Sequence, residues 1–135
     1  MSAPTLPRIL LVDDDEGVLN SLQRVLRGRF DVTATSDAKA AIRMVVSDQP
    51  FAVVVSDLRM PGMDGISLLY LMRQAAPDTI RILLTGDVDL EAAVLAINQG
   101  NIFRFLTKPC APEDLLAALE AAVNVYRSRT PRIST

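Results

Sequence analysis

Three aspartates stand where apolar segments of the sequence end. Asp13 and Asp14 follow the run Ile9–Val12, and Asp57 follows the run Val53–Ser56. Carboxylates gathered in one place raise one another's pKa unless a cation compensates their charge. Mg²⁺ prefers such oxygen ligands and usually keeps several water molecules. These residue types therefore predict a magnesium site, provided that the fold brings the three side chains together.

Two further polar residues follow apolar segments later in the chain. Thr85 ends the segment Ile80–Leu84, and Lys108 comes shortly after Phe103–Leu106. A hydroxyl group and an ammonium group can both bind the oxygens of a phosphoryl group. Combined with a metal ion and a carboxylate nucleophile, they predict phosphoryl transfer. Taken singly, either residue would be an ordinary strand-end or loop residue, so the prediction depends on all the groups meeting at one edge.

The composition excludes several other kinds of site. The chain of 135 residues has no histidine and one cysteine, Cys110, which excludes an imidazole base, a zinc site and an intrachain disulfide. Its net charge of −2 argues against nucleic-acid contact by this domain. No apolar run approaches the roughly 18 residues of a membrane span. We expect a cytoplasmic domain without membrane contact.

Short apolar segments alternate with segments of helical periodicity. The predicted strands are Ile9–Val12, Val32–Thr35, Phe51–Ser56, Ile80–Leu84 and Phe103–Leu106. The helical stripes are Val18 to Leu26, Ile42 to Val46, Ile66 to Met72, Ala93 to Ile97 and Leu115 to Tyr126. Strict alternation predicts an α/β fold with a doubly wound parallel sheet. With the strand order 2-1-3-4-5, the aspartates would converge between the first and third strands.

Short polar residues and glycine mark the expected helix ends. Side-chain oxygens favour the N-cap, glycine favours the position after a helix, and proline suits the first turn. The marking residues are Asp14 or Asp15 for the first helix, Ser36 for the second, Asp64 for the third, Gly100 at the end of the fourth and Pro112 for the fifth.

These segments resemble the receiver domain of two-component response regulators, a flavodoxin-like three-layer sandwich with five helices. The stretch Ile9-Leu-Leu-Val-Asp-Asp-Asp15 resembles its acidic opening, and Asp57-Leu-Arg-Met-Pro-Gly-Met-Asp-Gly65 resembles the segment after its phosphorylated aspartate. Leu84-Thr-Gly86 and Thr107-Lys-Pro109 match its threonine and lysine motifs. The resemblance covers residues 7–126, which leaves 1–6 as an extension and 127–135 as a tail or the start of a linker.

The resemblance implies a signalling domain that catalyses only its own phosphorylation and dephosphorylation. Its phosphodonor would be the phosphohistidine of a sensor histidine kinase or of a histidine phosphotransfer protein. The implied roles are phosphoacceptor for Asp57, Mg²⁺ ligands for Asp13, Asp14, Asp57 and the backbone carbonyl of Arg59, and phosphoryl contacts for Thr85 and Lys108.

The resemblance also implies how the signal is timed and passed on. Arg59 and Asp87 would flank the path of attacking water and tune the phosphoryl lifetime. Thr85 and Phe105 would switch the surface of the fourth helix, fifth strand and fifth helix, through partner docking or a homodimer. A cis peptide bond is expected between Lys108 and Pro109.

Three questions remain open at this point. Asp13-Asp14-Asp15 also resembles the opening of haloacid-dehalogenase phosphatases, but Gly86-Asp87 precedes Lys108, the reverse of that family's order, and Asp57 would have no role. A nucleotide-binding module is a further alternative, but this chain has neither of the two glycine motifs that would indicate one. The output could lie in a separate partner or in a missing C-terminal domain, because Ala96–Pro109 is similar to receivers attached to HD-GYP phosphodiesterases and to some hybrid kinases.

Overall fold

Five parallel strands form one sheet in the computed structural model, which describes residues 5–47, 49–58, 60–63, 65–86 and 90–129. The strands are β1 (Arg8–Val12), β2 (Asp31–Thr35), β3 (Val53–Ser56), β4 (Ile80–Thr85) and β5 (Arg104–Thr107). Their order is β2-β1-β3-β4-β5. Both the α/β class and the strand order predicted from the sequence are confirmed.

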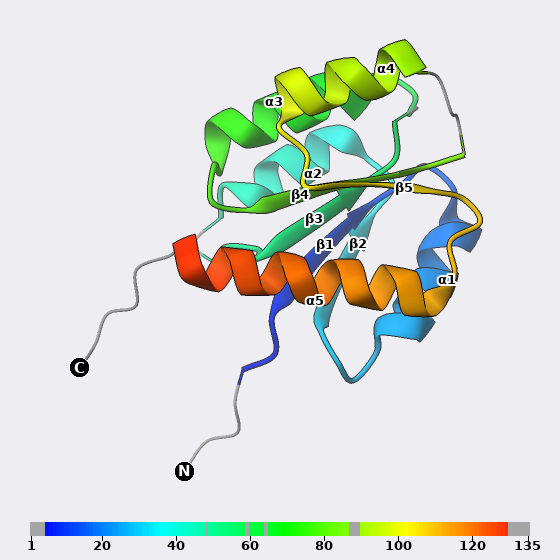
Figure 1. The fold of residues 1–135 in the computed structure, drawn as a ribbon, viewed down its shortest axis with the longest axis vertical. Helices are drawn as coiled ribbons and strands as arrows, with labels where there is room; N and C mark the ends of the chain where they lie inside the picture. The colour runs from blue at the N-terminus through cyan, green and yellow to red at the C-terminus, as the bar shows by residue number, and fades with distance from the viewer. Residues whose placement is uncertain (1–4, 48, 59, 64, 87–89, 130–135) are drawn as a thin grey trace.

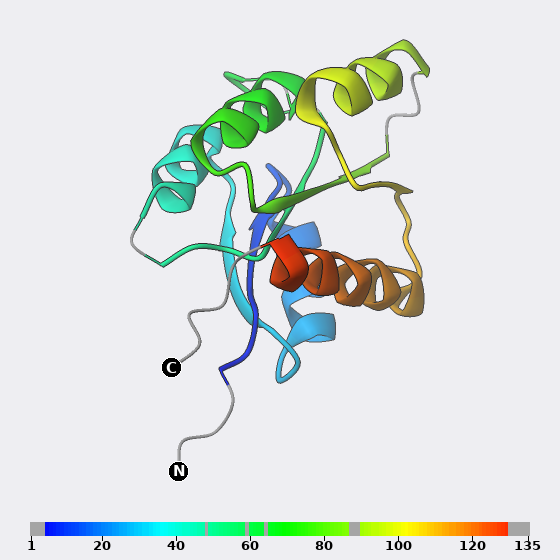
Figure 2. The same ribbon diagram turned by 60° about the vertical axis from the view of Figure 1, so that its left-hand side comes forward.

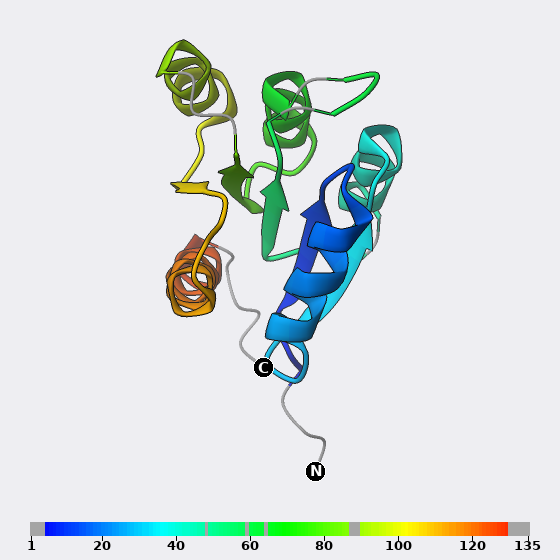
Figure 3. The same ribbon diagram turned by 90° about the vertical axis from the view of Figure 1, so that its right-hand side faces the viewer.

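The helices cover the sheet on both faces and make a sandwich of three layers (Figures 1 and 3). They are α1 (Glu16–Leu26), α2 (Ala38–Val45), α3 (Gly65–Ala75), α4 (Leu90–Leu95), which continues as the π-helical turn η1 (Ala96–Gly100), and α5 (Pro112–Arg129). Helices α1 and α5 lie on one face, and α2, α3 and α4 lie on the other (Figure 3). None of the helices in the described ranges combines the length and apolar character that crossing a membrane requires.

Strand β1 shows why the apolar segments are continuous. Ile9 and Leu11 pack into the cluster under α1 and α5, whereas Leu10 and Val12 pack into the cluster under α2 and α3. All four side chains are at most 1% exposed, and burying one such side chain stabilises the fold by about 1.5–3 kcal/mol. A strand covered on both faces thus needs apolar residues at every position.

The N-terminus of α1 settles which aspartate caps it. Asp15 is the N-cap, and its Oδ1 accepts hydrogen bonds from the backbone N–H groups of Gly17 and Val18 at 2.9 and 3.2 Å. This contact satisfies two donors that the first helical turn leaves unpaired. Asp14 therefore has no capping role and is available to the site at the end of β1.

The N-cap predicted for α2 is wrong by one residue. Asp37, not Ser36, caps the helix and accepts from the N–H of Lys39 at 3.0 Å. Thr35 causes the shift, because its Oγ1 accepts from the N–H of Asp37 at 3.1 Å and turns the chain one residue later. The predicted cap of α3, Asp64, lies outside the described residues.

The prediction that Gly100 follows the fourth helix is also wrong, because Gly100 is the last residue of η1 and Asn101 takes the left-handed conformation, with φ of 51°. A Cβ at position 100 would lie 2.9 Å from the Cβ of Leu69. Glycine is therefore needed for the close packing of η1 on α3, which lie side by side in Figure 2. Asparagine tolerates the left-handed conformation better than most residues.

Candidate functional site

Two neighbouring strands bring three carboxylates together at the carboxyl edge of the sheet. Asp13 follows β1 and Asp57 follows β3, and the N–H of Asp57 donates to the carbonyl of Val12 at 3.0 Å. Carboxylate oxygens of Asp13, Asp14 and Asp57 all lie within 4.8 Å of one another. Asp13 and Asp57 are buried and Asp14 is exposed. The convergence expected between the first and third strands is therefore present.

Lys108 reaches this acidic cluster from the segment after β5. Its Nζ donates to Asp13 Oδ2 at 2.6 Å and to Asp57 Oδ2 at 3.0 Å. The backbone holds this segment beside β4, because the N–H of Lys108 donates to the carbonyl of Thr85 at 3.0 Å. The Lys108–Pro109 peptide bond is cis, as predicted. One ammonium group thus joins two buried carboxylates that come from different strands.

Backbone donors orient both buried carboxylates. The N–H of Leu58 donates to Asp57 Oδ1 at 2.6 Å, and the N–H of Asp15 donates to Asp13 Oδ1 at 2.9 Å. At the start of α3, Gly65 packs so closely that an added Cβ would collide with the Asp57 carbonyl oxygen. The two N–H donors could not be predicted from the sequence, because a backbone group leaves no signal in residue type.

The charges of the site do not balance within the described residues. Burial raises the pKa of Asp13, against the opposing effects of Lys108 and the Asp15 N–H. Burial alone would lower the pKa of Lys108, but hydrogen bonds to Asp13 and Asp57 outweigh it and raise that pKa. The ammonium group therefore stays protonated near neutral pH. A single positive charge beside three carboxyl groups leaves an excess of negative charge that a divalent cation can offset.

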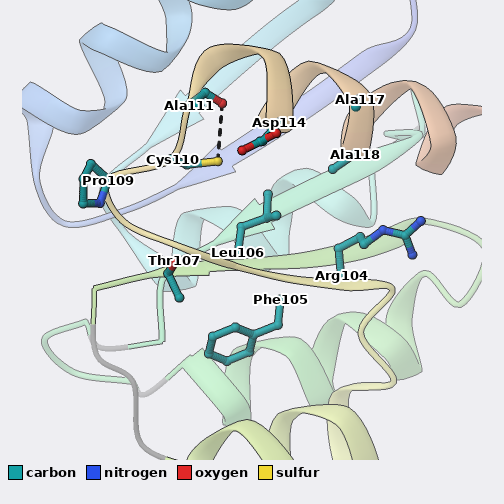
Figure 4. A pocket seen from close by; sticks show the side chains of 10 residues that line it. All are labelled: Arg104, Phe105, Leu106, Thr107, Pro109, Cys110, Ala111, Asp114, Ala117 and Ala118. Carbon is teal, nitrogen blue, oxygen red and sulfur yellow. Dashed lines mark hydrogen bonds between the residues drawn. The ribbon is translucent and has the colours of Figure 1, made fainter.

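The residues expected to switch the domain lie beside the site. Thr85 ends β4 and is 1% exposed. Phe105 is half-buried and packs against the cluster that contains Leu69 and Leu83. Figure 4 shows Phe105 on the α3 and α4 side of β5, with Leu106 on the side of α5. The two residues expected to tune the phosphoryl lifetime, Arg59 and Asp87, lie outside the described residues.

Fold and site together define a doubly wound α/β domain whose chemistry is centred on carboxylates and one lysine. The chain belongs to the response regulator receiver domain family, whose model matches residues 9–120. This membership favours the receiver interpretation over the haloacid-dehalogenase one, which left Asp57 without a role.

Several known proteins are similar to this chain. The DNA-binding transcriptional regulator NtrC of Escherichia coli strain K12 is 35% identical over 121 residues, which make up 90% of this chain and 26% of NtrC. The receiver domain of an HD domain-containing protein from Pseudomonas fluorescens Pf-5 is 40% identical, with a TM-score of 0.86 and coverage of 91% and 98%. The beryllofluoride-activated NtrC4 receiver domain dimer is 30% identical, with a TM-score of 0.81 and coverage of 88% and 98%. The chain spans about a quarter of the length of the curated relatives.

Proposed function

We propose that Asp57 accepts a phosphoryl group from the phosphohistidine of a sensor histidine kinase or a histidine phosphotransfer protein. A carboxylate oxygen of Asp57 attacks phosphorus, a P–O bond forms, and the P–N bond of the donor breaks, with the imidazole leaving and taking a proton. The observation that carries the proposal is the contact of Lys108 with Asp57 and Asp13. An ammonium group already beside the nucleophile can bind the phosphoryl oxygens as their charge develops.

The acidic cluster fits Mg²⁺ as the cofactor of this reaction. Asp13, Asp14 and Asp57 supply carboxylate oxygens within 4.8 Å of one another, the hard ligands that this ion prefers. We assign the fourth protein ligand to the backbone carbonyl of Arg59. When bound, the ion supplies charge neutralisation and orientation for the transferred group. The chain's own residues orient the nucleophile through the Leu58 N–H and shield it from bulk water, since Asp57 is 8% exposed.

We further propose that phosphorylation switches the surface formed by α4, β5 and α5. The phosphoryl group adds acceptor oxygens that the hydroxyl of Thr85 can reach. The segment after Thr85 then moves inward and vacates space beside β5, and Phe105 turns into that space. This surface carries exposed apolar side chains, among them Val94, Leu95 and Ile97. The similarity to the NtrC4 receiver dimer supports a homodimer or a partner docked on this surface as the next step.

The output follows from this surface and not from a reaction of the domain. We infer that the domain catalyses only the gain and loss of its own phosphoryl group, and that it works in the cytoplasm, as the family suggests. A further domain of the same polypeptide or a separate partner would carry the output. The 40% identity to a receiver from an HD domain-containing protein is compatible with an output of the HD type.

The proposed phosphoacceptor is tested with acetyl phosphate and Mg²⁺. Intact-protein mass spectrometry should show one acid-labile phosphoryl group on the wild type and none on Asp57→Asn, which keeps the shape and removes the nucleophile. Asp15→Asn is the matched control, since it changes a nearby acid and preserves the N-cap. Undiminished incorporation in Asp57→Asn would refute the assignment. Loss in both variants would point to damage of the fold instead.

A further inference from the structure

A pocket lies at the amino ends of the strands, away from Asp57. It has a volume of about 210 Å³ and is lined by Ile80, Arg81, Asn101, Ile102, Phe103 and Arg129. Figure 1 shows the last turn of α5 and the start of β4 at the same end of the molecule. The residues of this pocket take no part in the phosphoryl chemistry proposed above.

Arg81 is a buried cation on the wall of this pocket. Its side chain is 2% exposed. Its Nε donates to the carbonyl of Gly100 at 2.7 Å, and Nη1 donates to the carbonyl of Thr79 at 2.8 Å. The described part of the chain offers its second terminal nitrogen, Nη2, no hydrogen bond and offers the guanidinium no carboxylate. A buried charge normally has an ionic partner, so this arrangement is incomplete.

Two further arginines add positive charge around Arg81. Arg129, in the last turn of α5, lines the same pocket, and Arg73 of α3 donates to the carbonyl of Gln99 at 3.3 Å. Burial, followed by the charges of Arg129 and Arg73, lowers the pKa of Arg81 to about 10. The chain as a whole has a net charge of −2, so this local excess of positive charge does not reflect the composition.

We propose that this pocket binds an oxyanion, either a carboxylate or a phosphate group, through the guanidinium groups of Arg81 and Arg129. Guanidinium N–H groups match the oxygens of such an anion in a fork geometry, and ionic hydrogen bonds of this kind are about twice as strong as neutral ones. Ile80, Ile102 and Phe103 supply the apolar part of the lining. The volume suits one small group, because pockets for drug-sized ligands start at about 300 Å³.

An anion in this pocket would connect parts of the molecule that the proposed switch uses. Arg81 holds the carbonyl of Gly100 at the end of η1, and Arg129 belongs to α5. One bound oxyanion would therefore bridge the η1–β5 connection and the end of α5. This site is independent of Asp57, since the two lie at opposite edges of the sheet.

The proposal is tested by titrating ¹⁵N-labelled protein with inorganic phosphate or with acetate, without Mg²⁺ and at constant ionic strength set by chloride. The amide signals of Asn101, Ile102 and Phe103 should shift and saturate, and the shifts near Asp57 should not follow the same curve. Tighter binding of phosphate would indicate a phosphorylated ligand. Tighter binding of acetate would indicate a carboxylate from a protein side chain or an organic acid.

Arg129→Gln supplies the decisive variant, because it removes an exposed charge and leaves the core unchanged. We expect it to weaken binding about tenfold, which equals about 1.4 kcal/mol. Arg127→Gln is the matched control in the same turn of α5, and it lines a different pocket. Equal affinities of the wild type and Arg129→Gln, or no saturable shift with either anion, would overturn the proposal.

Discussion

Lys108 and Arg81 are two cations at opposite edges of the same sheet, and their surroundings differ sharply. Lys108 donates to two carboxylates, Asp13 and Asp57, and these partners raise its pKa. Arg81 donates to the backbone carbonyls of Gly100 and Thr79, and burial beside other arginines lowers its pKa to about 10. The charge of Lys108 is balanced by two carboxylates, whereas the guanidinium of Arg81 is held by neutral backbone carbonyls.

The difference separates a lysine that a reacting group can reach from an arginine whose hydrogen bonds also hold the fold together. Lys108 sits at the carboxyl edge, where loops after β1, β3 and β5 meet and where a reacting group can enter. Its side chain is 23% exposed, so it can exchange a carboxylate for a phosphoryl oxygen. Arg81 is 2% exposed, and its Nε and Nη1 connect the end of η1 to the α3–β4 turn, which leaves Nη2 for the anion proposed above. Substitution should therefore damage activity at one edge and stability at the other.

The largest effect is expected for Arg81→Met. The carbonyls of Gly100 and Thr79 would stay buried without their donor, and we expect the free energy of unfolding to fall by about 3 kcal/mol. Urea denaturation followed by circular dichroism measures this change. Arg73→Met, which removes a half-buried arginine bound to carbonyls of η1, should lower stability by less than about 1 kcal/mol. Similar losses in the two variants would show that burial of Arg81 has no special importance.

Lys108→Ala should mainly change the rate of phosphorylation. Removing one positive group from a site of charge development costs about 100-fold in rate, or roughly 2.7 kcal/mol. The rate of phosphoryl incorporation from acetyl phosphate, at saturating Mg²⁺, is the measurement. Lys39→Ala removes the chain's other lysine, on α2, and should leave the rate unchanged. A wild-type rate in Lys108→Ala would mean that its contact with Asp57 is not functional.

Asp15→Ala tests whether every acid at the carboxyl edge serves the reaction. Loss of the N-cap should lower the free energy of unfolding by about 1 kcal/mol. Asp15→Asn should restore most of that stability, because asparagine is an equally good cap. Phosphorylation should stay within the wild-type range in both variants when it is measured well below their melting temperatures. A loss of phosphorylation in Asp15→Asn would instead place Asp15 within the site.

The smallest effect is a gain of stability in Asp13→Asn, measured without Mg²⁺. Because folding raises the pKa of Asp13 from 3.8, the ionised carboxyl destabilises the folded protein at neutral pH. The variant should therefore be more stable there than the wild type. As the pH falls through the raised pKa, the wild-type carboxyl takes up its proton and the difference should vanish. A gap that persists at low pH, or a less stable variant at neutral pH, would contradict this account.

The sequence by itself determined the sheet, its order and most members of the site. Short continuous apolar segments that alternate with helical ones are typical of strands covered on both faces, and polar residues at the ends of parallel strands meet at one edge, as Asp13 and Asp57 do. The sequence did not predict two helix ends correctly. Thr35 moved the cap of α2 to Asp37, and close packing on Leu69 put Gly100 inside η1. Only the tertiary structure decided how the charges were compensated. Contacts between distant segments determine the pairing of Lys108 with the carboxylates and the burial of Arg81 beside other arginines. The residue type gives the charge of a side chain, but it does not show which groups surround that side chain.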